Sequence, residues 1–212
     1  MINAILWDND GTLIESEPIY RDAAIKAFKK YKIDLTHTVI DKYSALALKD
    51  YFQALINHYE IKISPDEMIK EYRAHGRKSH KKIKLTPHIR GILNSLKSSY
   101  KMGIVTNANR DWLEYILTTH RLRHFFKVTI TRDDVLEGKP FAEPYLKAAY
   151  SLGAKPNETV VIEDSTLGFQ GAKAAGMLII ARKSPYNTGQ DFSLADYVVE
   201  DLREIQNILA TI

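Results

Sequence analysis

The chain has 212 residues, of which 45% are hydrophobic and 26% charged, and it carries a net charge of +4 and no cysteine. This composition is typical of a globular protein and excludes collagen-like, disordered and low-complexity classes. The lack of cysteine excludes disulfides, thiolate metal sites and a cysteine nucleophile. No apolar run approaches the ~20 residues of a membrane span, and Asp8 and Asp10 interrupt an N-terminus that lacks the cationic start of a signal peptide. We therefore expect a soluble, cytoplasmic protein, a monomer or weak dimer with no membrane partner.

The basic excess of the chain is concentrated in one stretch. Residues 16–85 hold 15 Lys and Arg against 9 Asp and Glu, whereas the rest of the chain holds 15 against 17. No helix-turn-helix, zinc finger or aromatic–basic RNA motif accompanies this charge, so we expect no nucleic-acid partner. The stretch is either a set of solvated helix faces or a basic surface that faces an anionic small molecule.

The first predicted element is a buried strand, Ala4–Trp7, which is too short for a helix and ends in an acidic turn. Residues 17–85 then show helical patterns only. One runs from Pro18 to about residue 31, a second spans residues 41–59, and a third begins at the capping box Ser64-Pro65-Asp66-Glu67. An all-helical, basic segment thus interrupts the chain after its first strand.

From residue 86 onward, short apolar runs alternate with helical patterns. Strands are predicted over residues 102–106, 128–130, 160–162, 177–180 and 197–199. One helix is predicted to begin at Thr86-Pro87, with Thr86 as its N-cap. Further helices are predicted over residues 111–120, 144–152 and 167–175 and around Ile205–Leu209. Gly153 and Gly176 are expected to end the helices 144–152 and 167–175. This alternation predicts parallel strands joined by helical crossovers, and so a three-layer α/β sheet.

The predicted domain organisation follows from these patterns. We expect a Rossmann-like parallel-sheet core formed by residues 1–16 and 86–212, which would carry the catalytic groups. Residues 17–85 would form an inserted all-helical cap domain.

Polar side chains gather where the predicted strands end, and parallel sheets bind their ligands at that edge. The members of this group are, in chain order, Asp8, Asp10, Thr12, Thr106, Asn107, Lys139, Glu163 and Asp164. Crowded carboxylates repel one another unless a cation compensates them, and hard oxygen ligands suit magnesium better than zinc. Magnesium, a lysine and small hydroxyl or amide donors are what a transferring phosphoryl group requires. One aspartate can then attack phosphorus, and another two residues away can transfer protons.

Four motifs in this order resemble those of the haloacid dehalogenase superfamily. They are Asp8-Asn9-Asp10-Gly11-Thr12-Leu13, Thr106-Asn107, Gly138-Lys139-Pro140, and Glu163-Asp164-Ser165 followed by Gly168 and Gly171. Residues 14–18 are similar to the lead-in to the helical cap of one branch, which contains beta-phosphoglucomutase, phosphoglycolate phosphatase and sugar phosphatases. The resemblance covers nearly the whole predicted core.

The resemblance implies a role for each matching residue. Asp8 would be the nucleophile that forms an aspartyl-phosphate, and Asp10 the general acid and base. Lys139 would offset the charge between Asp8 and the phosphoryl group and help to bind that group. Thr106 and the Asn107 amide would bind the phosphoryl oxygens. The resemblance further implies that Mg²⁺ is held by Asp8, Asp10 through its backbone carbonyl, Asp164, and Glu163 directly or through water.

The expected function is therefore a magnesium-dependent phosphatase of a small phosphorylated metabolite, of the sugar phosphate or phosphoglycolate type. An intramolecular phosphomutase of the beta-phosphoglucomutase type is the second hypothesis, although residues 42–46 lack the Gly and the Arg-rich pattern of the mutase cap. True dehalogenases are disfavoured, because they lack an acid at the position of Asp10. The third hypothesis is a non-catalytic binding protein of the same fold. Buried like charges cost much free energy, so their retention without a catalytic use argues against it.

Overall fold

The computed structural model describes all residues, Met1–Ile212, and these form two compact units. The first unit comprises residues 1–14, 85–183 and 192–212, and the second comprises residues 15–84 and 184–191. None of the helices combines the length and the hydropathy that crossing a bilayer requires.

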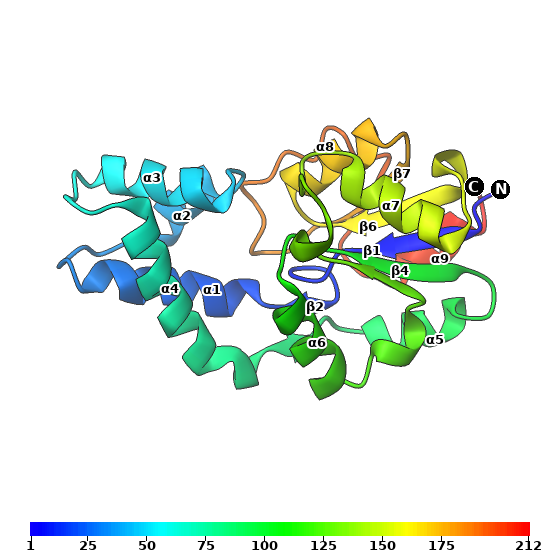
Figure 1. The fold of residues 1–212 in the computed structure, drawn as a ribbon, viewed down its shortest axis with the longest axis horizontal. Helices are drawn as coiled ribbons and strands as arrows, with labels where there is room; N and C mark the ends of the chain where they lie inside the picture. Colours follow the sequence, from blue (N-terminus) through cyan, green and yellow to red (C-terminus); the bar gives the residue numbers. More distant parts are fainter. The chain divides into compact units, whose positions relative to one another are not determined.

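The first unit is built on a six-stranded sheet of order β5-β4-β1-β6-β7-β8 (Figure 1). Its strands are β1 (Ala4–Trp7), β4 (Lys101–Val105), β5 (Val128–Ile130), β6 (Thr159–Glu163), β7 (Leu178–Arg182) and β8 (Tyr197–Val199). Every neighbouring pair is parallel. β1 lies in the middle, where Ile5 pairs with Met102 of β4 and Val160 of β6. The predicted parallel α/β sheet is confirmed.

Helices cover both faces of this sheet, because successive side chains of a strand point to opposite faces. Ile5 and Trp7 of β1 pack in one hydrophobic cluster with α5, α6 and α9, whereas Ala4 and Leu6 pack in a second with α7 and α8 (Figure 1). The bounds of these helices are α5 (Ile89–Leu96), α6 (Arg110–Thr119), α7 (Glu143–Leu152), α8 (Thr166–Ala174) and α9 (Glu204–Leu209). The unit also contains short 3-10 helices at Arg123–Phe125, Arg132–Asp134 and Pro156–Glu158. Two short strands, β2 (Ile14–Glu15) and β3 (Lys84–Leu85), pair with each other where the chain leaves the first unit and returns to it, so the expectation of helices alone over residues 17–85 is wrong at its end. All three predicted layers are present.

The predicted start of the helix after residue 86 is wrong. α5 begins at Ile89, and the residue that precedes it, His88, has a φ of 65°, in the left-handed region that favours glycine. Thr86 caps nothing, since its hydroxyl is buried without a hydrogen-bond partner. The left-handed residue turns the chain after Pro87, so the helix begins at Ile89, two residues later than the Thr-Pro pair predicts.

The second unit contains four helices, α1 (Glu17–Lys29), α2 (His37–Tyr43), α3 (Leu48–His58) and α4 (Pro65–Ser79), and the 3-10 helix His80–Lys82. They enclose a hydrophobic cluster centred on Phe28, Phe52 and Met68. The capping box predicted for the start of α4 is confirmed, because Ser64 accepts from the Glu67 amide and Glu67 accepts from the Ser64 amide.

The single helix predicted over residues 41–59 is wrong, because a break separates α2 from α3. Ser44 donates its hydroxyl to the carbonyl oxygen of Asp41 at 3.0 Å, a local bond that competes with helix continuation. Ala47 is extended, with φ −61° and ψ 150°, and begins α3. Apolar periodicity continues across the break and therefore did not reveal it.

Residues 184–191 follow β7 in the chain, where the sequence analysis assigned them to the core, but they belong to the helical unit. Arg21 of α1 donates to the carbonyl oxygen of Tyr186 at 2.6 Å, and Gln190 donates to the carbonyl oxygen of Ser44 at 3.0 Å. Gly189 lies so close to α2 that a Cβ there would be 2.1 Å from a backbone oxygen. We call this segment the strap.

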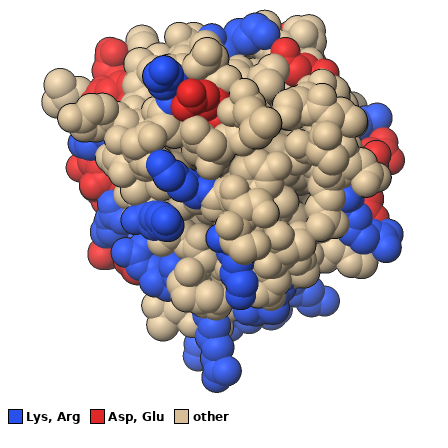
Figure 2. All heavy atoms as spheres, turned by 90° about the vertical axis from the view of Figure 1, so that its right-hand side faces the viewer, with Lys and Arg blue, Asp and Glu red and all other residues tan.

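Basic side chains are numerous on the face of the molecule where both chain ends lie, as Figure 2 shows, and the acidic side chains seen there lie mostly toward its margins. The N-terminus leads into the amino end of β1. The predicted catalytic carboxylates follow the opposite, carboxyl end of the strands. The basic face in Figure 2 is therefore not the edge that carries the predicted site.

Candidate active site

The carboxylates predicted at the strand ends come together at the carboxyl edge of the sheet. β1 and β6 are adjacent, and the Asp8 amide continues their ladder by donating to the carbonyl oxygen of Ile162 at 2.9 Å. Asp8, Glu163 and Asp164 are all buried, and each offers a carboxylate oxygen within 4.8 Å of the others. We call these three residues the carboxylate cluster.

Lys139 is the counter-charge of the carboxylate cluster. Its ammonium lies 2.5 Å from Oδ1 of Asp8 and also pairs with Oε1 of Glu163. The other oxygen of Glu163 accepts hydrogen bonds from the Asp164 amide at 2.6 Å, the Ser165 amide at 2.8 Å and the Ser165 hydroxyl at 3.0 Å. Both oxygens of this fully buried carboxylate are thus engaged, and one of them orients Lys139 toward Asp8.

The loop that carries Lys139 is held by the end of β4. Asn107 accepts from the Lys139 amide at 2.8 Å and donates to the Lys139 carbonyl oxygen at 3.0 Å. Both polar groups of the Asn107 side chain are therefore hydrogen-bonded to the backbone of Lys139. The neighbouring Thr106 is buried, and its hydroxyl accepts from the Ala108 amide at 3.1 Å.

Two motif glycines allow the carboxylates to approach the backbone. Gly11 has a φ of +82°, and a Cβ there would lie 2.0 Å from Oδ2 of Asp164. In α8, a Cβ on Gly168 would lie 2.0 Å from Cδ of Glu163. Real side chains essentially never approach so closely, so these positions must be glycine for the carboxylates to stand where they do.

The electrostatics of the carboxylate cluster call for a further cation. Burial would lower the pKa of Lys139, but Asp8 and Glu163 reverse this and raise it well above its ordinary value. Burial raises the pKa of Asp8 well above its usual range, because Lys139 only partly offsets the desolvation and Glu163 adds repulsion. Three buried carboxylates face one ammonium, and their hard oxygens suit a divalent cation such as Mg²⁺ or Ca²⁺. The residues present therefore fit a divalent metal.

Asp10 lies at the same strand end, but its carboxylate is outside the carboxylate cluster. It is half-buried and accepts from the side-chain amide of Asn9 at 3.0 Å. The indole N–H of Trp112 also donates to it, at 3.3 Å to Oδ1 and 3.2 Å to Oδ2. Of the four acids predicted to hold metal, Asp10 is thus the one whose carboxylate lies outside the carboxylate cluster and accepts from Asn9 and Trp112.

Sequence reasoning missed two residues of this region. Arg182 is buried at the end of β7 and donates through Nη1 to the carbonyl oxygen of Gly11, and so braces the turn after Asp10. The predicted strand ended two residues earlier, at Ile180, although an arginine that closes an apolar run was a usable signal. Trp112, on the first turn of α6, was treated as part of an ordinary helix. Its place on the first turn of the helix that follows β4 and the Thr106-Asn107 motif was the signal available.

Comparison with known proteins agrees with this geometry. Residues 5–182 match the family model described as haloacid dehalogenase-like hydrolase. A validoxylamine A 7'-phosphate phosphatase from Streptomyces hygroscopicus subsp. limoneus is 29% identical, over 97% of each chain. A pyrophosphatase PpaX from Anoxybacillus flavithermus is 33% identical and covers 82% of this chain and 80% of its own.

Solved structures share the fold over the full length of the chain. A haloacid dehalogenase-like protein from Agrobacterium tumefaciens superposes with a TM-score of 0.88 at 21% identity, covering 100% of this chain and 99% of its own. CbbY from Rhodobacter sphaeroides, solved in complex with phosphate, gives a TM-score of 0.78 at 24% identity, with 97% and 96% covered. Since the family model spans most of the sequence and the relatives cover it nearly end to end, the chain belongs to the haloacid dehalogenase-like hydrolase family, among its phosphoric monoester hydrolases.

Proposed function

We propose that this enzyme is a magnesium-dependent phosphatase that hydrolyses a small phosphorylated metabolite, of the sugar phosphate or phosphoglycolate type, through an aspartyl-phosphate on Asp8. The observation that carries the proposal is the buried carboxylate cluster with Lys139 bridging Asp8 and Glu163. The phosphatase relatives, one named for a 7'-phosphate substrate, support a phosphate ester as the substrate.

The metal would be held by Asp8, Asp164 and the backbone carbonyl of Asp10. When bound, Mg²⁺ would supply positive charge to the phosphoryl oxygens and to the attacking carboxylate. Glu163 has a different role in this proposal. Because one of its oxygens pairs with Lys139 and the other accepts three hydrogen bonds, it holds the lysine rather than the metal.

In the first step, a carboxylate oxygen of Asp8 bonds to phosphorus and the bond from phosphorus to the leaving oxygen breaks. Asp10 gives its proton to that leaving oxygen. Lys139, at 2.5 Å from Asp8, offsets the negative charge as nucleophile and phosphoryl group approach each other. Thr106 and the Asn107 backbone amide would bind the phosphoryl oxygens, since the Asn107 side chain already holds Lys139.

In the second step, the oxygen of a water bonds to phosphorus, and the bond between phosphorus and Asp8 breaks. Asp10, now a carboxylate, takes the proton from that water. The products are inorganic phosphate and the free Asp8 carboxylate, and Asp10 is protonated again for the next cycle.

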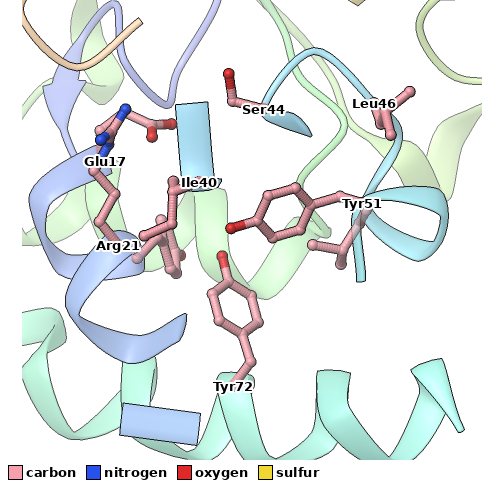
Figure 3. Close-up of a pocket in the computed structure, with 9 residues that line it drawn as sticks. Glu17, Arg21, Ile40, Ser44, Leu46, Tyr51 and Tyr72 are labelled. Carbon is pink, nitrogen blue, oxygen red and sulfur yellow. The ribbon is translucent and has the colours of Figure 1, made fainter. Parts of the chain in front are cut away.

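In this proposal residues 17–85, which make up most of the second unit, act as the cap that selects the organic part of the substrate. It contains a cavity of about 260 Å³ lined by Glu17, Arg21, Tyr51, Tyr72 and apolar side chains (Figure 3). The hydroxyl groups of Tyr51 and Tyr72 point toward each other in Figure 3. The volume lies just below the range of about 300–1,000 Å³ that is typical of small-ligand pockets, so the cavity would suit a small organic group.

A screen of phosphorylated metabolites for release of inorganic phosphate, with and without Mg²⁺, tests the proposal. We expect metal-dependent phosphate release from a small set of sugar phosphates or related esters, and none from the Asp8→Asn variant. Conversion of a sugar phosphate to its isomer without phosphate release would favour the phosphomutase. Absence of turnover on every metabolite and on aryl phosphates would contradict a catalytic function.

A further inference from the structure

The Asp10 carboxylate receives N–H groups from two separate parts of the chain. Asn9, its neighbour, donates to Oδ2 at 3.0 Å. Trp112 lies 102 positions away in sequence, and its indole N–H is shared between Oδ1 at 3.3 Å and Oδ2 at 3.2 Å. The adjacency of β1 and β4 brings the two residues together, because Asp10 follows β1 and α6 follows β4.

Trp112 is itself held in place. Its backbone N–H donates at 2.9 Å to the side chain of Asn109, the N-cap of α6. Its ring stacks on Tyr115 one turn later, with centroids 5.6 Å apart and planes inclined by 18°. The indole N–H is therefore presented by a rigid group on the first turn of a capped helix.

A rigid, uncharged donor suits a carboxylate that must give and take protons. The indole nitrogen only donates, so it orients the carboxylate without adding a competing charge or accepting the proton that is in transit. An aspartate free to rotate would need to be reoriented in each turnover, whereas a held one starts from the reactive geometry.

We propose that Trp112 is a positioning residue that holds Asp10 in the orientation from which it accepts the proton of the attacking water. This inference rests on the proposed function. In the affected step the water oxygen bonds to phosphorus, the bond from phosphorus to Asp8 breaks, and the water proton passes to Asp10. Inorganic phosphate and free Asp8 result.

The variant Trp112→Phe keeps an aromatic ring on Tyr115 but removes the N–H. Trp112→His restores an N–H at the equivalent ring position, since Nε2 of histidine overlays Nε1 of tryptophan. Tyr115→Phe is the matched control, because it alters the neighbouring residue on the same helix but keeps both the stacked ring and the indole N–H. All are assayed at pH 8 with Mg²⁺ and labelled p-nitrophenyl phosphate, by acid-quench pulse–chase that follows decay of the phosphoenzyme.

We expect phosphoenzyme decay to slow about tenfold in Trp112→Phe, which corresponds to about 1.4 kcal/mol of barrier. KM should be unchanged, Trp112→His should recover part of the rate, and Tyr115→Phe should stay within about twofold of wild type. Equal effects in Trp112→Phe and Tyr115→Phe, or unchanged or faster decay in Trp112→Phe, would overturn the inference. Failure of the wild-type enzyme to form a phosphoenzyme or release phosphate would instead overturn the proposed function on which it rests.

Discussion

Replacement of Glu163 by glutamine tests whether Glu163 holds Lys139 in place or binds the metal. The glutamine carbonyl oxygen must face the amides of Asp164 and Ser165 and the Ser165 hydroxyl, because all three groups are donors. Its NH₂ group then faces the Lys139 ammonium, so that two donors meet where an ion pair stood. The loss of a hydrogen bond to a charged group in a buried site costs about 2 kcal/mol, since Asp8 still pairs with Lys139.

For a chain of this length, that loss lowers Tm by roughly 4–8 °C. Thermal unfolding followed by circular dichroism measures it, and isothermal titration measures Mg²⁺ affinity. We expect Glu163→Gln to lose stability and change the affinity for Mg²⁺ by less than about tenfold. Asp164→Asn, the matched variant, should weaken Mg²⁺ binding by more than about a hundredfold. If Glu163→Gln instead abolished Mg²⁺ binding and left Tm unchanged, Glu163 would be a metal ligand and our reasoning would be wrong.

Four further substitutions test the account of stability. Gly189→Ala in the strap should destabilise the protein by about 1–3 kcal/mol, because its Cβ would lie 2.1 Å from a backbone oxygen of α2. Gly91→Ala in α5, which meets nothing within 4 Å, should stabilise it by about 0.5–1 kcal/mol, and equal effects in denaturant unfolding would refute the packing argument. His88→Gly should raise Tm, because φ is 65° there, and a lower Tm would show that the ring contributes more than the backbone strain. Burial would raise the pKa of Asp134, but hydrogen bonds from Thr131 and the charge of Arg110 lower it overall. Its stabilisation is therefore present above about pH 4, the ordinary pKa of an aspartate, and is lost on acidification. Unfolding of Asp134→Asn should depend less on pH below about pH 4, and an unchanged pH dependence would contradict this.

Several features of the fold follow from local sequence signals. β1 and β8 begin and end at the predicted residues because short apolar runs there are flanked by turn-forming or charged residues. Gly153 ends α7 in the left-handed conformation that only glycine adopts readily. The carboxylates came together as expected, since any parallel sheet gathers its strand ends at one edge.

Other features depend on contacts that leave no pattern in the sequence. The strap is held through carbonyl oxygens, such as that of Ser44, and every residue carries such an oxygen. Arg182 likewise braces Gly11 through a backbone carbonyl. The bond from Trp112 to Asp10 depends on which strands are neighbours, and strand order cannot be read from periodicity.

We expect Asp8 to carry the phosphoryl group during turnover. Wild-type enzyme mixed with labelled p-nitrophenyl phosphate and Mg²⁺, quenched in acid and digested, should give a phosphorylated peptide that contains Asp8. Asp8→Asn should give none and should lose more than ~10³-fold in turnover, roughly 4 kcal/mol of barrier, while keeping its Tm within a few degrees. A phosphorylated peptide elsewhere in the chain, or substantial turnover by folded Asp8→Asn, would contradict the account.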